Sequence, residues 1–216
     1  MVTNRQCAGS DSEFHHADVV GCRCRSLSVC IFSGGDSRRM GEDKALLAHP
    51  DGGVWLTALI AQVQPLDWPI RVVTRHRAHG ELLQDQPKVR VWQEPAPWAG
   101  PLQALARVLP AVSDEALLVM PVDMPRLSTA VLRQLIAAWQ LQPDRVAVAH
   151  DGQRLQPLLA VIPSGSPFQS VLIEQVTAGR YRWLDWLNRV PHQMVSLPPS
   201  ALVNANRPED LAALFA

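Results

Sequence analysis

Glycines and cationic side chains are concentrated in one short segment, residues 33–44, whose sequence is SGGDSRRMGEDK. Its three glycines allow backbone N–H groups to approach an anion and to adopt positive φ angles. Arg38, Arg39 and Lys44 add formal charge that suits a polyphosphate. The segment follows an apolar run, residues 28–32, and open α/β sheets bind ligands at the carboxyl ends of such strands. The pattern predicts a loop that holds a nucleoside triphosphate.

This loop differs from the two common phosphate-binding signatures. A P-loop contains Gly-Lys followed by Ser or Thr, and the dinucleotide fingerprint spaces its glycines as G-x-G-x-x-G. Here Gly34 and Gly35 are adjacent, so neither pattern is met. An ordinary solvated turn also contains glycine, serine and charges, but three glycines and three basic residues after an apolar strand favour a binding site.

A second candidate for chemistry is Asp123. It follows the most apolar run of the chain, residues 116–120, and lies between Pro121 and Pro125. Mg²⁺ in proteins is commonly held by one or two carboxylates together with substrate phosphates. An aspartate that caps the next segment is the alternative. Beside a phosphate-binding loop, Asp123 is predicted to hold Mg²⁺.

Segments of strand and helix pattern must position these residues, and they alternate along the chain. The expected strands are residues 28–32, 70–74, 89–92, 116–120, 145–149 and 158–162. The expected helices are residues 55–64, 80–84, 100–109, 129–140, 167–175, 183–188 and 211–215. The alternation predicts an α/β fold with a doubly wound, mostly parallel sheet. The last two strands flank Asp151-Gly152 and predict an antiparallel hairpin, an addition near the C-terminus.

The composition excludes several classes of protein. Lys+Arg and Asp+Glu both number 20, so no global basic field would recruit nucleic acid or an anionic membrane. The sequence contains no run of eighteen apolar residues, so no transmembrane helix is predicted. Hydrophobic residues make up 47% of the 216-residue chain, which is enough for one sizeable core.

The beginning of the chain differs from the rest. Cys7, Cys22, Cys24 and Cys30 all lie within the first 30 residues, which argues against a disulfide framework for the whole domain. The Cys-x-Cys spacing does not make the paired knuckles of a zinc site, and no apolar segment marks a secretory signal. We expect residues 1–26 to be a poorly ordered extension, or the result of a start codon placed too early. Residues 27–216 are expected to form a single domain in the cytoplasm.

Residues 32–44 closely resemble the signature L-A-G-G-x-S-x-R-M-G-x-D-K of the molybdenum cofactor guanylyltransferases. The first motif is also found in nucleotidyltransferases that act on sugars and on cytidine substrates, whereas the whole series is more specific. The resemblance covers about residues 28–216. The later matches, in family order, are Gly100-Pro101-Leu102, residues 121–125, His150-Asp151-Gly152 and residues 204–211.

The resemblance implies a Rossmann-like nucleotidyltransferase fold and a Mg²⁺-dependent enzyme. Such an enzyme transfers GMP from GTP to Mo-molybdopterin, forms molybdopterin guanine dinucleotide and releases pyrophosphate. A monomer is expected, with GTP and molybdopterin as ligands and molybdopterin-delivering proteins as candidate partners. The family motifs imply a nucleotide site of Phe32, Ser33, Gly34, Gly35 and Glu94, triphosphate contacts from Arg39 and Lys44, Mg²⁺ on Asp123, and a pterin side at Asn204 and Asn206.

Arg180 and Arg182 form a further basic patch that would suit the pterin phosphate or pyrophosphate, or else a solvated turn between two helices. Three positions depart from the family pattern. Gln103-Ala104 replaces Ala-Gly, Thr74-Arg75 occupies the place of a base-binding asparagine, and Glu94 replaces an aspartate. Two alternatives therefore stay open: a cytidylyl- or sugar-nucleotidyltransferase on the same fold, and a non-catalytic protein that binds nucleotide. The adjacent Gly34-Gly35 pair favours guanine.

Overall fold

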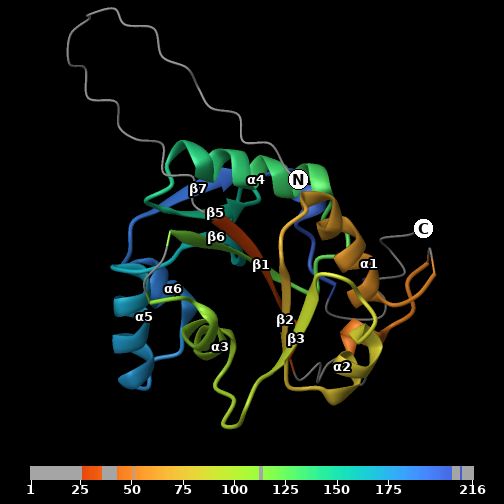
Figure 1. Cartoon of the computed structure of the whole chain (residues 1–216). Coiled ribbons are helices and arrows are strands. Elements are labelled where there is room, and N and C mark those ends of the chain that lie inside the picture. Colours follow the sequence, from red (N-terminus) through yellow and green to blue (C-terminus); the bar gives the residue numbers. More distant parts are fainter. Residues whose placement is uncertain (1–25, 36–42, 51, 112–113, 206–209, 211–216) are drawn as a thin grey trace, which may run out of the picture.

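The apolar runs of the sequence form one seven-stranded sheet, which crosses the middle of the computed structural model (Figure 1). The structure describes residues 26–35, 43–50, 52–111, 114–205 and 210. The strand order is β3-β2-β1-β4-β6-β5-β7. The strands are β1 (Ser26–Phe32), β2 (Ile70–Thr74), β3 (Val89–Gln93), β4 (Glu115–Pro121), β5 (Val146–His150), β6 (Leu155–Pro163) and β7 (His192–Ser196).

Six of these strands point the same way, and β6 runs antiparallel to both β4 and β5. The predicted α/β class, the mostly parallel sheet and the antiparallel addition near the C-terminus are all confirmed. The addition is an inserted strand, because β6 lies between β4 and β5. A register shift in the β5–β6 pair leaves Pro157, Leu158 and Leu159 as a bulge on β6.

The helices cover both faces of the sheet. They are α1 (Trp55–Val63), α2 (Arg77–Leu83), α3 (Pro101–Val108), α4 (Thr129–Leu141), α5 (Phe168–Thr177) and α6 (Trp183–Leu187), with short 3₁₀ turns η1 (Lys44–Leu46), η2 (Gln64–Leu66) and η3 (Pro199–Ala201). In the described ranges, none of the helices combines the length and apolarity that crossing a bilayer requires.

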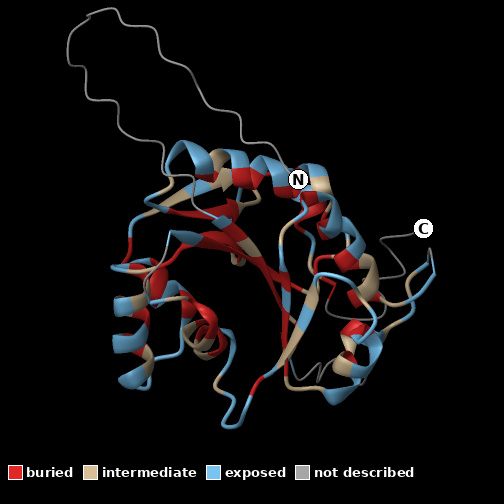
Figure 2. Cartoon of the chain, viewed as in Figure 1, coloured by how far each residue is buried: buried red, intermediate tan, exposed pale blue. Residues whose placement is uncertain are grey.

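Two apolar cores result, one on each face. Along β1, Val29 and Ile31 belong to the core under α1, α2 and α4, whereas Cys30 belongs to the core under α3, α5 and α6. Successive side chains of a strand point to opposite faces, so a strand buried on both sides must be apolar throughout. Figure 2 shows this burial along the inner strands. The near-continuous apolarity of β1 and β4 is thereby explained.

The structure corrects three details of the predicted elements. Strand β7 was not predicted, and α2 begins at Arg77 rather than at Gly80. The first strand begins at Ser26, a residue within the range expected to be a poorly ordered extension. The helix predicted over residues 211–215 lies outside the described residues.

The strand order reverses between β1 and β4, and this reversal positions the candidate site. The chain passes from β1 outward to β2 and β3, then returns to place β4 on the other side of β1. Phe32, at the end of β1, pairs in register with Pro121, at the end of β4. The segments that follow these two strands therefore leave the sheet side by side, where doubly wound sheets bind ligands.

Candidate active site

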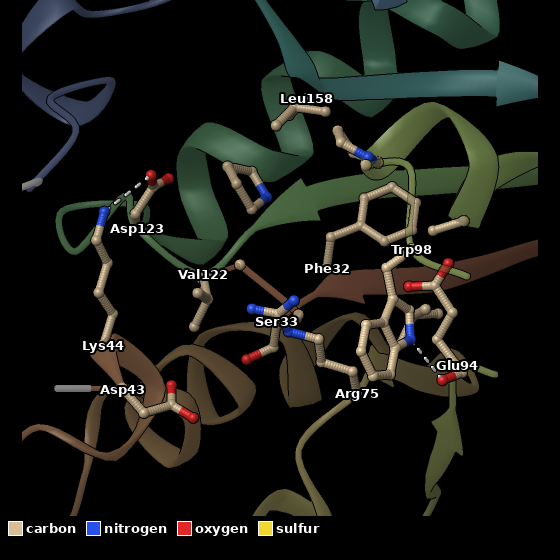
Figure 3. Close-up of a pocket in the computed structure, with 17 residues that line it drawn as sticks. Phe32, Ser33, Asp43, Lys44, Arg75, Glu94, Trp98, Val122, Asp123 and Leu158 are labelled. Atoms are coloured by element: carbon tan, nitrogen blue, oxygen red, sulfur yellow. Dashed lines mark hydrogen bonds and ion pairs between the residues drawn. The ribbon is translucent and has the colours of Figure 1, made fainter. Parts of the chain in front are cut away.

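A pocket of about 350 Å³ opens at this edge of the sheet (Figure 3). A volume of this size accommodates a nucleotide-sized ligand. Its walls come from β1, β2 and β4 and the segments after them, from the connection between β3 and α3, from the start of α3 and from β6. The lining residues are Phe32, Ser33, Gly34, Gly35, Asp43, Lys44, Val73, Arg75, Glu94, Trp98, Gly100, Pro101, Ala104, Pro121, Val122, Asp123 and Leu158.

One end of the pocket carries opposite charges in close contact. The Lys44 Nζ atom lies 3.5 Å from Asp123 Oδ2, and both side chains remain partly accessible, at 17% and 26% exposed (Figure 3). Lys44 is the first residue of η1, whose N-cap is Asp43. Asp43 Oδ1 accepts a hydrogen bond from the Ala45 backbone N–H at 3.0 Å. This cap fixes the local backbone from which Lys44 extends.

The opposite end of the pocket combines a carboxylate with an aromatic ring. Arg107 Nη1 donates to Glu94 Oε1 at 2.7 Å, and the Trp98 indole N–H donates to the Glu94 backbone carbonyl at 2.9 Å. The Trp98 ring is 51% exposed, and the Arg75 guanidinium lies 5.3 Å from its centre. Burial raises the pKa of Glu94 above its usual value, against the opposing charges of Arg107 and Arg75. The pocket is thus polar at both ends, with different chemistry at each.

Backbone conformation corrects one expectation about the glycines. Neither Gly34 nor Gly35 has a positive φ, and a Cβ atom there would meet at most ordinary contacts. The fold alone therefore does not require glycine at these two positions, whereas close approach by a ligand would. Gly100, at the N-cap of α3, does have a positive φ of 98° and needs glycine for that reason.

Most of the predicted site residues are brought together. Among the described residues, the pocket is lined by Phe32, Ser33, Gly34, Gly35, Lys44, Glu94 and Asp123. Arg39 and Asn206 lie outside the described residues. The predicted pterin-side residue Asn204 donates to Gln156 Oε1 at 3.4 Å, and the next residue, Ala205, donates its N–H to the Asp123 carbonyl at 2.9 Å. The Asn204 segment therefore packs directly beside Asp123.

Arg180 and Arg182 are placed differently. Neither residue is part of the pocket lining. Arg180 lies 3.8 Å from Glu174 on α5, and Arg182 lies 4.0 Å from Asp185 on α6. Their surroundings match the solvated turn that was the alternative interpretation of this basic patch, and their assignment to the substrate gains no support from the geometry.

Trp98 and Leu158 line the pocket but were not predicted as site residues, and Arg75 was noted only as part of the Thr74-Arg75 pair at the place of a base-binding asparagine. Arg75 directly follows the apolar strand β2, as Ser33 follows β1, and this position was the available signal. Trp98 lies in a segment rich in proline and glycine after β3, which is typical of a loop but does not indicate where its ring points. Leu158 lies in the bulge on β6, an irregularity that its apolar sequence does not indicate.

The sequence of residues 29–192 matches the family model described as MobA-like NTP transferase domain. The chain belongs to this family. A protein from Rhodopirellula baltica named "Probable molybdenum cofactor guanylyltransferase" is 33% identical over 86% of this chain and 90% of its own length. As a member of the family, the chain is an enzyme, a nucleotidyltransferase.

Solved structures share the fold of this family member. Molybdopterin-guanine dinucleotide biosynthesis protein A from Archaeoglobus fulgidus superposes with a TM-score of 0.67 at 19% identity, over 87% of this chain and 96% of that one. A 4-diphosphocytidyl-2C-methyl-D-erythritol synthase from Anaerococcus prevotii superposes with a TM-score of 0.65 at 11% identity, over 88% and 96%. The same architecture therefore occurs in proteins named for guanine and for cytidine products, and the fold does not decide the base.

Proposed function

We propose that this enzyme transfers GMP from GTP to Mo-molybdopterin, forming molybdopterin guanine dinucleotide and releasing pyrophosphate. The observation that carries the proposal is a single pocket with Lys44 and Asp123 at one end and Glu94 at the other. The first end suits phosphates and the second suits a base that presents N–H groups. The name of the Rhodopirellula baltica relative supports molybdopterin as the acceptor.

The donor set at Asp123 fits Mg²⁺. The described residues contain no cluster of three or more His, Cys, Asp or Glu side chains that could hold a metal alone. One carboxylate beside phosphate oxygens is a common Mg²⁺ environment, because this ion keeps waters and substrate oxygens as ligands. Asp43 also lines the pocket, but both of its carboxylate oxygens already accept hydrogen bonds. Asp123 would therefore hold Mg²⁺, which supplies charge neutralisation for the phosphates.

The chain's own residues would contribute position and charge. A terminal phosphate oxygen of molybdopterin attacks the α-phosphorus of GTP, and the bond from that phosphorus to the bridging oxygen of the β-phosphate breaks. Lys44 stabilises the negative charge that develops on the leaving pyrophosphate. The backbone at Ser33, Gly34 and Gly35 packs against the nucleotide. No protein nucleophile is required for this direct displacement.

Glu94 is proposed to recognise the base. Guanine presents the N1–H and N2–H₂ donors on one edge, whereas the matching edge of cytosine presents an acceptor beside its amino group. The carboxylate oxygen of Glu94 that does not pair with Arg107 can accept from the guanine donors. Arg107 keeps the group in place, and the Arg75–Trp98 pair provides a wall beside it.

Replacing Glu94 with glutamine is expected to lower kcat/KM for GTP by about tenfold or more, since a hydrogen bond to a charged group contributes about 1.5–3 kcal/mol. kcat/KM for CTP should change little, so the ratio of the two is the measurement. Glu81→Gln, on the exposed surface of α2, is the matched control. An unchanged GTP-to-CTP ratio in Glu94→Gln would contradict base recognition by Glu94.

A direct assay tests the proposed function as a whole. The purified chain is incubated with Mg²⁺, molybdopterin and either GTP or CTP, and pyrophosphate release is followed. Transfer from GTP is expected. Exclusive use of CTP would assign a cytidylyltransferase instead, and nucleotide binding without pyrophosphate release would contradict molybdopterin as the acceptor.

A further inference from the structure

One buried histidine has no part in the chemistry described so far. His79 lies on α2, is 0% exposed and is not among the residues that line the pocket. Its Nε2 atom lies 2.9 Å from Asp43 Oδ2, and its Nδ1 atom lies 2.8 Å from Thr74 Oγ1. A buried imidazole with both nitrogens in hydrogen bonds has a fixed orientation.

The two residues that contact His79 connect it to opposite ends of the loop formed by residues 33–44. The Thr74 hydroxyl lies 3.1 Å from the Ser33 carbonyl, where the loop begins. Asp43 precedes Lys44, where the loop ends. A continuous set of contacts, Ser33–Thr74–His79–Asp43, therefore joins the two ends of one loop through a side chain from α2.

The acceptor groups among these four residues determine where the protons of His79 and Thr74 lie. Asp43 is an acceptor as a carboxylate, so the Nε2 atom of His79 must carry a proton. The Thr74 hydroxyl accepts the backbone N–H of His76 at 3.0 Å and has a single proton to donate. It bonds the Ser33 carbonyl and His79 Nδ1 at the same time when it donates to the carbonyl and accepts from Nδ1–H. Burial raises the pKa of Asp43, but the hydrogen bond and charge of His79, with the Ala45 N–H, bring it below the usual value. The carboxylate is thus held ionised beside the imidazole.

Asp43 connects the fixed imidazole of His79 to the backbone at Lys44, at the end of the pocket proposed to bind phosphates. Its Oδ2 faces His79 while its Oδ1 accepts the Ala45 N–H and caps η1, the turn that begins with Lys44. The Lys44 side chain then extends to within 3.5 Å of Asp123. If the His79 contact is lost, Asp43 can leave the cap, and the backbone under Lys44 loses its anchor.

We propose that His79 is a positioning residue that clamps both ends of the 33–44 loop and thereby keeps Lys44 directed at the bound triphosphate. An apolar side chain would fill the same buried place at lower desolvation cost, so the imidazole serves its two polar contacts. The functional part of this inference rests on the proposed binding of GTP. The clamp itself concerns the ligand-free chain and has its own readout.

The test compares His79→Phe, which keeps a ring but removes both hydrogen bonds, with Thr74→Val, which removes the hydroxyl at similar volume. Gln175→Met is the control: Gln175 is a buried amide on α5, outside the pocket lining, whose Nε2 donates to the Arg182 carbonyl. Each variant is checked for folding by thermal unfolding, and its Kd for Mg²⁺–GTP is then titrated well below Tm.

His79→Phe, which removes the contact with the Asp43 carboxylate, is expected to raise the Kd for Mg²⁺–GTP by about tenfold or more. Thr74→Val, which removes an ordinary hydroxyl hydrogen bond, is expected to raise it by about two- to tenfold. Thr74→Ser, which retains the hydroxyl, should bind more tightly than Thr74→Val. Gln175→Met should lower Tm without changing Kd. A Tm loss with unchanged Kd in both His79→Phe and Thr74→Val would overturn the positioning role.

Hydrogen exchange separates failure of the clamp from failure of the proposed function. In the nucleotide-free chain, backbone amides of residues 43–47 are expected to exchange faster in His79→Phe than in the wild type, with no such change in Gln175→Met. Unchanged exchange would reject the clamp whatever the ligand. Faster exchange in a chain whose wild type binds no Mg²⁺–GTP would support the clamp and reject GTP as the ligand.

Discussion

Lys44→Ala is expected to lower kcat for nucleotidyl transfer by about 10²-fold or more, because removing one preorganised charge contact at a reacting centre commonly has an effect of this size. The Lys44 ammonium lies in the pocket beside Asp123 and is only 17% exposed, so solvent screening there is reduced. Its role is proposed to strengthen as charge builds on the leaving pyrophosphate. kcat should therefore fall together with kcat/KM.

Steady-state pyrophosphate release under saturating GTP measures this effect. Lys88→Ala is the matched control, since Lys88 is an exposed lysine that pairs with Asp67 outside the pocket lining. Lys44→Arg is informative as well, because the larger planar guanidinium keeps the charge but not the geometry. Near-normal kcat in Lys44→Ala would contradict the assigned role.

Asp123→Asn is expected to lower kcat by a similar factor of about 10² or more and to raise the Mg²⁺ concentration that gives half-maximal activity. Asparagine keeps the size of the side chain but loses the charge that binds a hard cation. The substitution also removes the charge partner of Lys44, which lies 3.5 Å away. Both changes act at the end of the pocket that Lys44 and Asp123 line.

The measurement is a Mg²⁺ titration of pyrophosphate release for the wild type, Asp123→Asn and Asp185→Asn. Asp185, on α6, pairs with Arg182 and lies outside the pocket lining, so its variant should titrate like the wild type. Chelation of Mg²⁺ should abolish release in all three. A wild-type Mg²⁺ response in Asp123→Asn would show that another group holds the ion.

The sheet could be predicted from the sequence where strands are buried on both faces. Strands such as β1 and β4 stand out as continuous apolar runs because each face packs on a helical layer. Strand β7 was not predicted because, among the strands that the structure describes, it pairs only with β5 and leaves Met194 65% exposed. HQMVS therefore shows neither an apolar run nor clear alternation. Hydrophobic periodicity alone is a weak predictor of a strand at such an edge of a sheet.

The candidate site also contains residues that the sequence predicts and residues that it does not. The loop ends and Asp123 were found because their residue types and their place after apolar strands carry chemical meaning without coordinates. His79 could not be found, since its partners Asp43 and Thr74 are joined to it only by folding and lie 36 and 5 positions away. The position of the Trp98 ring could not be predicted either, because the sequence of a loop does not show where its tryptophan ring points.

The walls of the pocket differ in how readily their residues can be substituted during evolution, because one wall belongs to strand β6 and another to a loop. Leu158 enters the pocket from a bulge in a strand that is hydrogen-bonded to neighbours on both sides, whereas Glu94 and Trp98 belong to the connection between β3 and α3. Substitutions in a connection are tolerated more readily than those within a paired strand. We therefore expect the residues at positions 94 and 98 to vary easily during divergence of this family, whereas the path of the chain at Leu158 is held by the paired residues on either side of the bulge, 155–156 and 160–163.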